Sequence, residues 1–133
     1  MNFKKFAQKY ANEIGGEFRD YDNNQSIIVI RLKGDRFQAV QGNVYNHEKY
    51  DGREVVQLKT KVCTADESID FTQVLASSAD NIHAKFIIED GFLKVESAAF
   101  MDSVNDSRIK EMLQEIGNLA DEWELKITGK DIY

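Results

Sequence analysis

The most reactive side chains in this sequence are two histidines, His47 and His83, and one cysteine, Cys63. Neither histidine has another strong metal ligand at a working spacing, and Cys63 has no Cys-x-x-Cys companion. The surrounding residues predict a loop position for His47, an outward-facing strand position for His83 and a strand-end thiol for Cys63. We therefore expect no metal site, no cofactor and no catalytic residue among them.

Acidic side chains offer the remaining chemistry, as acid/base couples or cation ligands. Asp20 with Asp22, and Glu89 with Asp90, are close in sequence, but each pair falls at an expected turn, where Asp bonds the local backbone. No spacing matches an EF-hand, a glycine-rich phosphate loop, a nucleophile elbow or a zinc-protease helix. Near the C-terminus, five acidic residues fit the solvated side of a helix: Glu111, Glu115, Asp121, Glu122 and Glu124. The sequence favours a protein that is not an enzyme.

Length and charge narrow the class further. The chain has 133 residues, the usual size of one domain, so residues 1–133 are read as a single unit. Its net charge is -6, from 17 Lys and Arg against 23 Asp and Glu, which disfavours nucleic acid as a partner. A single cysteine, no apolar signal segment and no apolar run of about 20 residues predict a cytoplasmic protein without a membrane partner.

Two helices are indicated by apolar residues at helical spacing. The first carries Phe3, Phe6, Ala7, Tyr10 and Ile14 and stops at Gly15 and Gly16. The second follows capping residues among Ser103, Asn105 and Asp106, and its apolar stripe contains Ile109, Met112, Leu113, Ile116, Leu119, Ala120 and Trp123. Each helix should bury one side.

Three strands are expected between Ser26 and Cys63, where β-branched and aromatic residues dominate. A two-residue turn at Gly34-Asp35 would set Ile28 opposite Gln41, and a second at Asp51-Gly52 would set Tyr45 opposite Leu58. Both turns predict one core face, made of Ile28, Ile30, Leu32, Phe37, Ala39, Tyr45, Val56, Leu58 and Val62.

A short helix and a second hairpin are expected next. Thr64 and Glu67 match a capping box, which would start a helix carrying Phe71, Val74 and Leu75. A turn at Asp90-Gly91 would pair Ile88 with Leu93 on the core side and Lys85 with Glu96 outside. The fold class is α+β, a single antiparallel sheet of about five strands with helices on one face, in the order α-β-β-β-α-β-β-α.

The opposite sheet face should not be fully polar. Ile27, Val29, Val40 and Val44 are placed there, so the first of these strands is apolar on both sides. Such a strand needs cover, which a second copy of the chain, a partner's segment or folded-over lysine stems could each supply. We assign the four residues as partner-binding and expect a homodimer.

The order of elements resembles the type III secretion chaperones and the related YbjN-like proteins, which are small bacterial domains. The sequence segments that carry this resemblance are Arg36-Phe-Gln-Ala-Val40, Gly52-Arg-Glu-Val-Val-Gln-Leu58, Val74-Leu75 with Asn81 to Ile88, Asp90 to Val95, and Ala120-Asp-Glu-Trp123. The resemblance implies a dimeric binding protein, since secretion chaperones hold an extended, unfolded effector segment along apolar surface. YbjN-like members are regulatory or chaperone-like.

Two functions from different classes follow. The first is a chaperone-like or regulatory domain that binds a peptide or protein segment on the outer sheet face or at a strand edge. The alternative is a small enzyme or ligand-binding protein with a polar cleft between the C-terminal helix and the sheet, around Gln41, Asn43 and Tyr45. Solid packing around those three residues would argue against the cleft.

Overall fold

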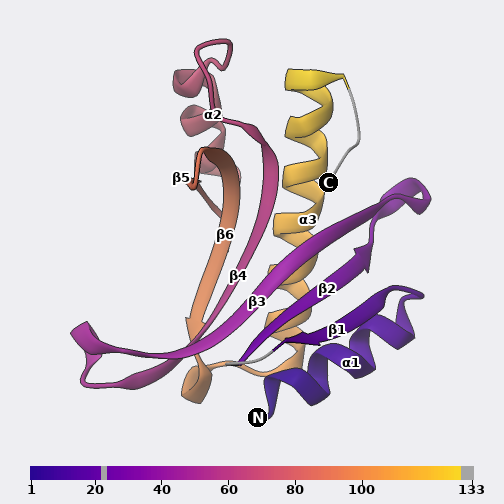
Figure 1. Ribbon diagram of the computed structural model, residues 1–133, viewed down its shortest axis with the longest axis vertical. Helices are drawn as coiled ribbons and strands as arrows, with labels where there is room; N and C mark the ends of the chain where they lie inside the picture. Colours follow the sequence, from indigo (N-terminus) through magenta and orange to yellow (C-terminus); the bar gives the residue numbers. More distant parts are fainter. Residues whose placement is uncertain (22–23, 130–133) are drawn as a thin grey trace.

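The structure, a computed structural model, describes residues 1–21 and 24–129. Within them, the strands form one six-stranded antiparallel sheet in the order β1-β2-β3-β4-β6-β5 (Figure 1). The strands are β1 (Glu17–Tyr21), β2 (Gln25–Arg31), β3 (Phe37–His47), β4 (Arg53–Thr64), β5 (Lys85–Glu89) and β6 (Phe92–Phe100). The α-helices of the same residues are α1 (Phe3–Glu13), α2 (Phe71–Ser77) and α3 (Asp106–Thr128).

This arrangement confirms the α+β class and the antiparallel sheet, and it adds strand β1 to the expected order. Strand β1 is short and mostly exposed, so it has no apolar alternation by which sequence could reveal it. Its one partly buried residue, Phe18, packs beside the core, and Asp20, on the same side of the strand, pairs with Lys4 of α1. All five residues of β1 pair with β2.

The helices and the sheet enclose the core on one side of the sheet. Helix α1 packs on β1 and β2, and α3 crosses β2, β3, β4 and β6 (Figure 1). Burying each large aliphatic side chain contributes about 1.5–3 kcal/mol. The fully buried members include Ile28, Ile30, Leu58, Leu93, Ile109, Leu113 and Ile116.

Helix α3 begins at a capping residue expected from sequence and ends at a glycine. The Asn105 side chain accepts a hydrogen bond from the backbone N–H of Arg108 at 2.9 Å, which caps its first turn. Gly129 ends the helix with φ of 70°. Gly117 lets α3 approach β2, because a Cβ there would lie 2.5 Å from Cδ1 of Ile30.

The first hairpin has a different register from the expected one. Ile28 lies opposite Val40, not Gln41. The connecting loop is a three-residue turn, and both Gly34 and Asp35 have positive φ, 73° and 58°. A loop one residue longer shifts β3 by one position, which moves all of its side chains to the other face.

The second hairpin is also shifted. Tyr45 lies opposite Val55, not Leu58, because a three-residue 3₁₀ turn, Glu48–Tyr50, precedes Asp51 and Gly52 in the loop. The shift is again an odd number of residues, so the two errors agree with each other. The expected core face was therefore right for β2 and β4 and wrong for β3.

Strand β3 buries the side chains that the sequence placed outside. Gln38 and Val40 point toward the helices, whereas Phe37 and Tyr45 lie on the uncovered face. Gln38 is polar yet buried, and its Nε2 donates to Thr60 Oγ1 at 2.7 Å and to the Lys61 carbonyl at 3.0 Å. Those bonds offset part of the desolvation cost of the amide.

The third hairpin has the expected register, with Ile88 opposite Leu93. Asp90 and Gly91 make the two-residue turn with φ of 54° and 78°. On the outer side, Lys85 Nζ lies 3.0 Å from a Glu96 carboxylate oxygen, as the sequence indicated. Local turn chemistry was sufficient to set this register, but Ile88, which was expected on the core side, is 61% exposed.

Helix α2 exists, but the capping box does not start it. Strand β4 continues to Thr64, which pairs with Phe92, and the helix begins after Asp70, whose side chain accepts from the Gln73 N–H at 3.1 Å. Val74 is buried, whereas Leu75 is 61% exposed. Sheet pairing thus outweighed the capping signal.

Candidate functional site

The sheet face turned away from the helices carries an apolar patch on β2 and β3. We define the outer patch as Ile27, Val29, Phe37 and Ala39. Val29 lies opposite Ala39 across the two strands, and Phe37 follows on the same face. Phe37 is 43% exposed, Ala39 is exposed, and Ile27 and Val29 are half-buried. Apolar side chains on an uncovered sheet face offer contact area to a partner.

Two of the four predicted partner-binding residues lie elsewhere. Val40 is 0% exposed and faces the helices, and Val44 packs beside the core on the same face. Their assignment to the outer face was wrong, because the β3 register is shifted by an odd number of residues. Ile27 and Val29 do lie outside, and their role in binding stays a prediction.

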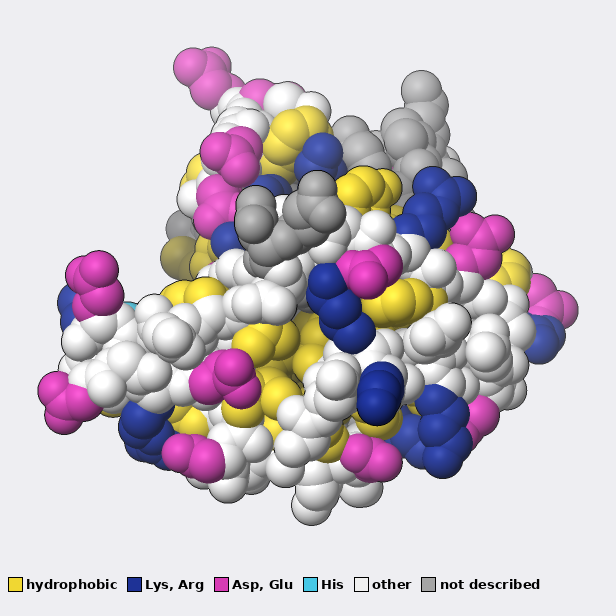
Figure 2. Space-filling model, turned by 60° about the horizontal axis from the view of Figure 1, so that its bottom comes forward, with side chains coloured by type: hydrophobic (Ala, Val, Ile, Leu, Met, Phe, Trp, Pro, Cys, Tyr) yellow, Lys and Arg dark blue, Asp and Glu magenta, His cyan; other side chains and the backbone are white. Residues whose placement is uncertain are grey.

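Val44 lines a separate hollow of about 250 Å³ near the start of α1. Phe3 and Met101 contribute apolar surface to the same hollow. Figure 2, which brings the lower end of Figure 1 forward, shows apolar side chains at the centre of this end and charges of both signs around them. Apolar surface is therefore not confined to the outer patch.

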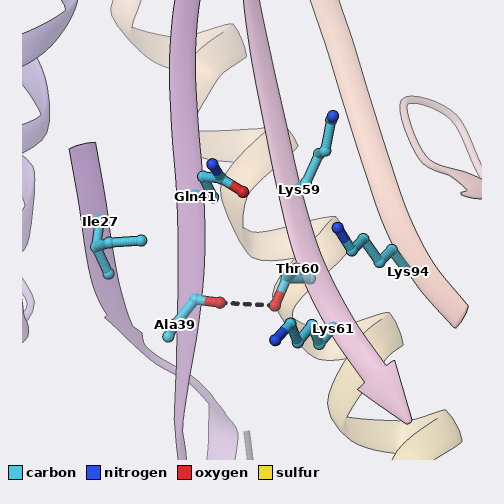
Figure 3. Close-up of a pocket in the computed structure, with 7 residues that line it drawn as sticks. All are labelled: Ile27, Ala39, Gln41, Lys59, Thr60, Lys61 and Lys94. Carbon is cyan, nitrogen blue, oxygen red and sulfur yellow. Dashed lines mark hydrogen bonds between the residues drawn. The ribbon is translucent and has the colours of Figure 1, made fainter. Parts of the chain in front are cut away.

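A larger hollow, of about 420 Å³, adjoins the outer patch. We call it the lysine hollow; its lining residues are Ile27, Ala39, Gln41, Lys59, Thr60, Lys61 and Lys94 (Figure 3). Figure 3 shows Lys61 and Lys94 reaching from β4 and β6 toward β3, which carries Ala39 and Gln41. The hydroxyl of Thr60 donates to the Ala39 carbonyl at 2.7 Å, which ties β4 to β3 where both strands line this hollow.

Two of the three lysines share one carboxylate. Glu89 accepts from Lys94 at 2.8 Å and from Lys59 at 2.9 Å, and Asp90 lies 3.5 Å from Lys94. The hydrogen bonds from Lys94 and then Lys59 hold the pKa of Glu89 below its ordinary value. Lys94 is only 7% exposed, and its ammonium group is held by the carboxylates of Glu89 and Asp90.

Two further hollows continue along the same face. The amide hollow, of about 320 Å³, is lined by Gln25, Gln41, Asn43, Gln57, Lys59, Glu89 and Asp90. The ring hollow, of about 540 Å³, includes Tyr45, His47, Tyr50, Gln57, Lys85, Glu96, Ala98 and Phe100. The amide hollow shares Gln41 and Lys59 with the lysine hollow and Gln57 with the ring hollow, so the three adjoin one another along this face.

Aromatic rings wall the far end of this surface. Tyr50 lies 5.0 Å from both the His47 ring and the Phe100 ring, in edge-to-face geometry. The Arg53 guanidinium stacks 3.6 Å from the Phe100 ring centroid and also donates to Asp102 at 2.7 Å. These contacts fix the rings in place.

The reactive side chains of the sequence are not brought together. His47 lies in the ring hollow, His83 lies 3.3 Å from Glu111, and Cys63 is buried at the end of β4. Burial raises the pKa of the Cys63 thiol, with Asp66 and Glu124 adding to the effect. In residues 1–21 and 24–129, no three His, Cys, Asp or Glu side chains are grouped to hold a metal ion.

The acidic pairs and the expected polar cleft also have other surroundings. Asp20 pairs with Lys4, while Asp22 lies outside the described residues. Gln41 and Asn43 line the amide hollow on the outer face, and Tyr45 lines the ring hollow. The cleft between the C-terminal helix and the sheet is therefore not built from these three residues, because β3 presents its other face to the helix.

Three acidic residues of α3 that the sequence placed in solvent are engaged with the protein. Glu115 accepts from the backbone N–H groups of Ile82, His83 and Ala84, at 3.2, 2.7 and 2.6 Å. Asp121 is buried and accepts from Arg36, and Glu124 is buried as well. Helical periodicity could have placed Asp121 and Glu124 beside the buried Ala120 and Trp123, but it carries no signal for the Glu115 contacts.

Comparison with known proteins rests on structure. No protein-family model and no curated protein matches the sequence. A chain of the HopA1–SchA chaperone–effector complex matches with a TM-score of 0.62 and 8% identity, over 92% of this chain and 92% of that chain. A chain of the ExsC–ExsE complex matches with a TM-score of 0.53 and 12% identity, over 94% and 92%.

The chain has the fold of type III secretion chaperones. The match spans more than nine-tenths of the chain, so it includes the uncovered sheet face as well as the helices. It confirms, for the fold, the resemblance to type III secretion chaperones drawn from the order of elements and turns. Among the described residues, none of the helices has the length and apolar character needed to cross a membrane.

Proposed function

We propose that this chain is a cytoplasmic, non-enzymatic, chaperone-like domain that binds an extended segment of another protein on its uncovered sheet face. The observation that carries the proposal is the outer patch, Ile27, Val29, Phe37 and Ala39, on the side of the sheet opposite α1 and α3. The fold supports it, since the SchA match comes from a chaperone–effector complex.

The physics of the surface favours an extended segment. Side chains on a flat strand surface alternate, so a guest in extended conformation can place every second side chain against the sheet. Ile27 and Val29 are half-buried already, and covering them removes apolar area from water at about 25 cal/mol per Å². A guest that is disordered beforehand must also offset its ordering entropy, which predicts moderate affinity.

We also propose that the protein is a homodimer that associates through the segment from α2 to β5. Among the described strands, β5 is an edge of the sheet, and an edge strand offers backbone groups for pairing with another chain. Leu75, Ile82 and Ile88 are 61%, 81% and 61% exposed, and all three belong to this segment. Edge pairing between two copies would cover both the strand and these side chains.

Binding of an unfolded polypeptide tests the first proposal. A reduced and carboxymethylated, permanently unfolded protein serves as the probe, and fluorescence anisotropy gives the affinity. Replacing Ile27 and Val29 together by lysine should weaken binding about tenfold or more, because two charges would occupy the apolar contact. Gln8→Lys with Asn12→Lys, which adds the same two charges at exposed positions of α1, is the matched control and should bind as the wild type does.

Two results would contradict this function. Absence of binding by the wild-type protein would remove it outright. Unchanged affinity in the Ile27→Lys, Val29→Lys protein, with circular dichroism like that of the wild type, would remove the outer patch as its site.

A further inference from the structure

The three connected hollows on the outer face differ in chemistry from end to end. Lysines surround the first, side-chain amides the second and aromatic rings the third. Neighbouring hollows share Gln41, Lys59 and Gln57, so the three adjoin in a row along β3 and β4, and we call this row the groove. A surface that binds any apolar segment equally would not need this order.

The length of the groove fits a short extended segment. It runs along β3 from Ala39 in the lysine hollow to Tyr45 in the ring hollow. At about 3.3 Å per residue that distance is about 20 Å, which a strand of about seven residues spans. The first and last side chains of such a strand point to the same side, so both can face the sheet.

The charge of the lysine hollow decides which peptide side chain binds at that end of the groove. The lysine hollow gathers Lys59, Lys61 and Lys94, whereas the whole chain carries a net charge of -6. Glu89 and Asp90, which line the neighbouring amide hollow, balance part of that positive charge. The lining of the lysine hollow itself contains three lysines and, among the described residues, no acidic side chain. A carboxylate is therefore favoured there over an ammonium group.

The aromatic and apolar surface of the ring hollow decides which side chain binds at the other end of the groove. Tyr50 and Phe100 stand at one wall of the ring hollow, and Ala98 leaves room between that wall and the Lys85–Glu96 pair. An aromatic side chain entering there would gain ring contacts as well as burial of area. Between the ends, amide side chains can bond the backbone of an extended guest as donors or acceptors.

We propose that the groove selects an extended peptide with an acidic side chain at the lysine hollow and an aromatic side chain about six positions away at the ring hollow. This inference rests on the proposed function and names the kind of segment that is bound. It separates this surface from the outer patch alone, which recognises apolar character without direction.

Defined peptides test the selection. The probes are fluorescein-labelled peptides of about seven residues with a serine and valine spacer, carrying aspartate at one end and phenylalanine at the other, in both chain directions. At least one direction should bind saturably to the wild-type protein. Peptides with lysine in place of aspartate, or alanine in place of phenylalanine, should bind about tenfold more weakly.

Variants of the groove locate the contact. Lys61→Glu should weaken binding of the aspartate peptide about tenfold and strengthen binding of the lysine peptide, a reversal that loss of folding cannot produce. Ala98→Trp should fill the ring hollow and remove the preference for phenylalanine. Lys9→Glu and Gln8→Trp, equal changes at exposed positions of α1, are the matched controls and should leave both affinities unchanged.

The outcomes separate this inference from the proposed function. If no peptide binds while the unfolded polypeptide still does, the groove selection is wrong and the proposed function stands. The same conclusion follows if the peptides bind but Lys61→Glu and Ala98→Trp leave their affinities unchanged. If neither the peptides nor the unfolded polypeptide bind, both proposals are overturned.

Discussion

Removing the Glu115 carboxylate should loosen the chain just before β5. This side chain on α3 accepts three consecutive backbone N–H groups, those of Ile82, His83 and Ala84. The same loop is tied to β6, because Ser97 Oγ donates to the His83 carbonyl at 3.1 Å. Glu115→Ala deletes the acceptor and leaves the loop held from the β6 side.

The expected cost follows from the number and kind of bonds. A hydrogen bond to a charged group contributes about 1.5–3 kcal/mol net, but water can reach part of this loop and replace some of the loss. We therefore expect Glu115→Ala to lower the free energy of unfolding by about 2 kcal/mol, roughly a 30-fold change in the folding equilibrium. Glu115→Gln should cost about half as much, since its one carbonyl oxygen can still accept from His83 and Ala84.

Urea denaturation and amide hydrogen exchange measure this effect. The titration should be repeated at several protein concentrations, because self-association would add to the apparent stability. Exchange should quicken at residues 82–84 more than in the centre of the sheet. Glu122→Ala is the control, because its pair with Lys126 is exposed and contributes about 0.3–0.5 kcal/mol.

Two outcomes would refute the reasoning about Glu115. One is an unfolding free energy no lower in Glu115→Ala than in Glu122→Ala. The other is unchanged exchange at residues 82–84 in a destabilised protein, which would place the lost stability elsewhere.

Three further predictions follow from the register, the sheet edge and the lysine hollow. Val40→Lys should lower the free energy of unfolding by about 3–5 kcal/mol in urea denaturation, while Ala39→Lys costs about 0.5 kcal/mol or less; similar costs would contradict the observed β3 faces. Ile88→Lys should convert a dimer to a monomer in analytical ultracentrifugation, whereas Ile27→Lys should not; a wild-type monomer at high concentration would contradict the proposed dimer. Because the pKa of Glu89 is lowered in the folded protein, its stabilisation is present above its ordinary pKa and lost as pH falls through the lowered value. Between about pH 5 and pH 3 the wild type should therefore lose more stability than Glu89→Gln does, and parallel losses would contradict this account.

Turn chemistry shows where sequence was sufficient and where it was not. Asp51-Gly52 and Asp90-Gly91 are the same dipeptide, and all four residues have positive φ. Asp90-Gly91 forms a two-residue turn, yet Asp51-Gly52 follows a 3₁₀ turn within a longer loop. The dipeptide fixed the local backbone angles in both cases, but it did not fix the loop length that sets register.

Some residues of the candidate site could be placed on the correct sheet face from sequence, and others could not. Ile27 and Val29 were placed correctly because β2 has its own clear alternation. Val40 and Val44 were misplaced because their face depended on two loop lengths. Gln38 added to the error, since its polar amide is buried beside Thr60 where the pattern favoured an apolar residue.

By itself the sequence determined the elements whose signals are local: the apolar stripes of α1 and α3, the N-terminal cap of α3, and the Asp90-Gly91 hairpin. Only the tertiary structure decided which face of β3 is buried, where Glu115 binds, and how lysine, amide and ring side chains from several strands form one groove. The physical reason is that periodicity and capping act within a few residues. Register and groove depend on burial summed over helices and strands far apart in the chain.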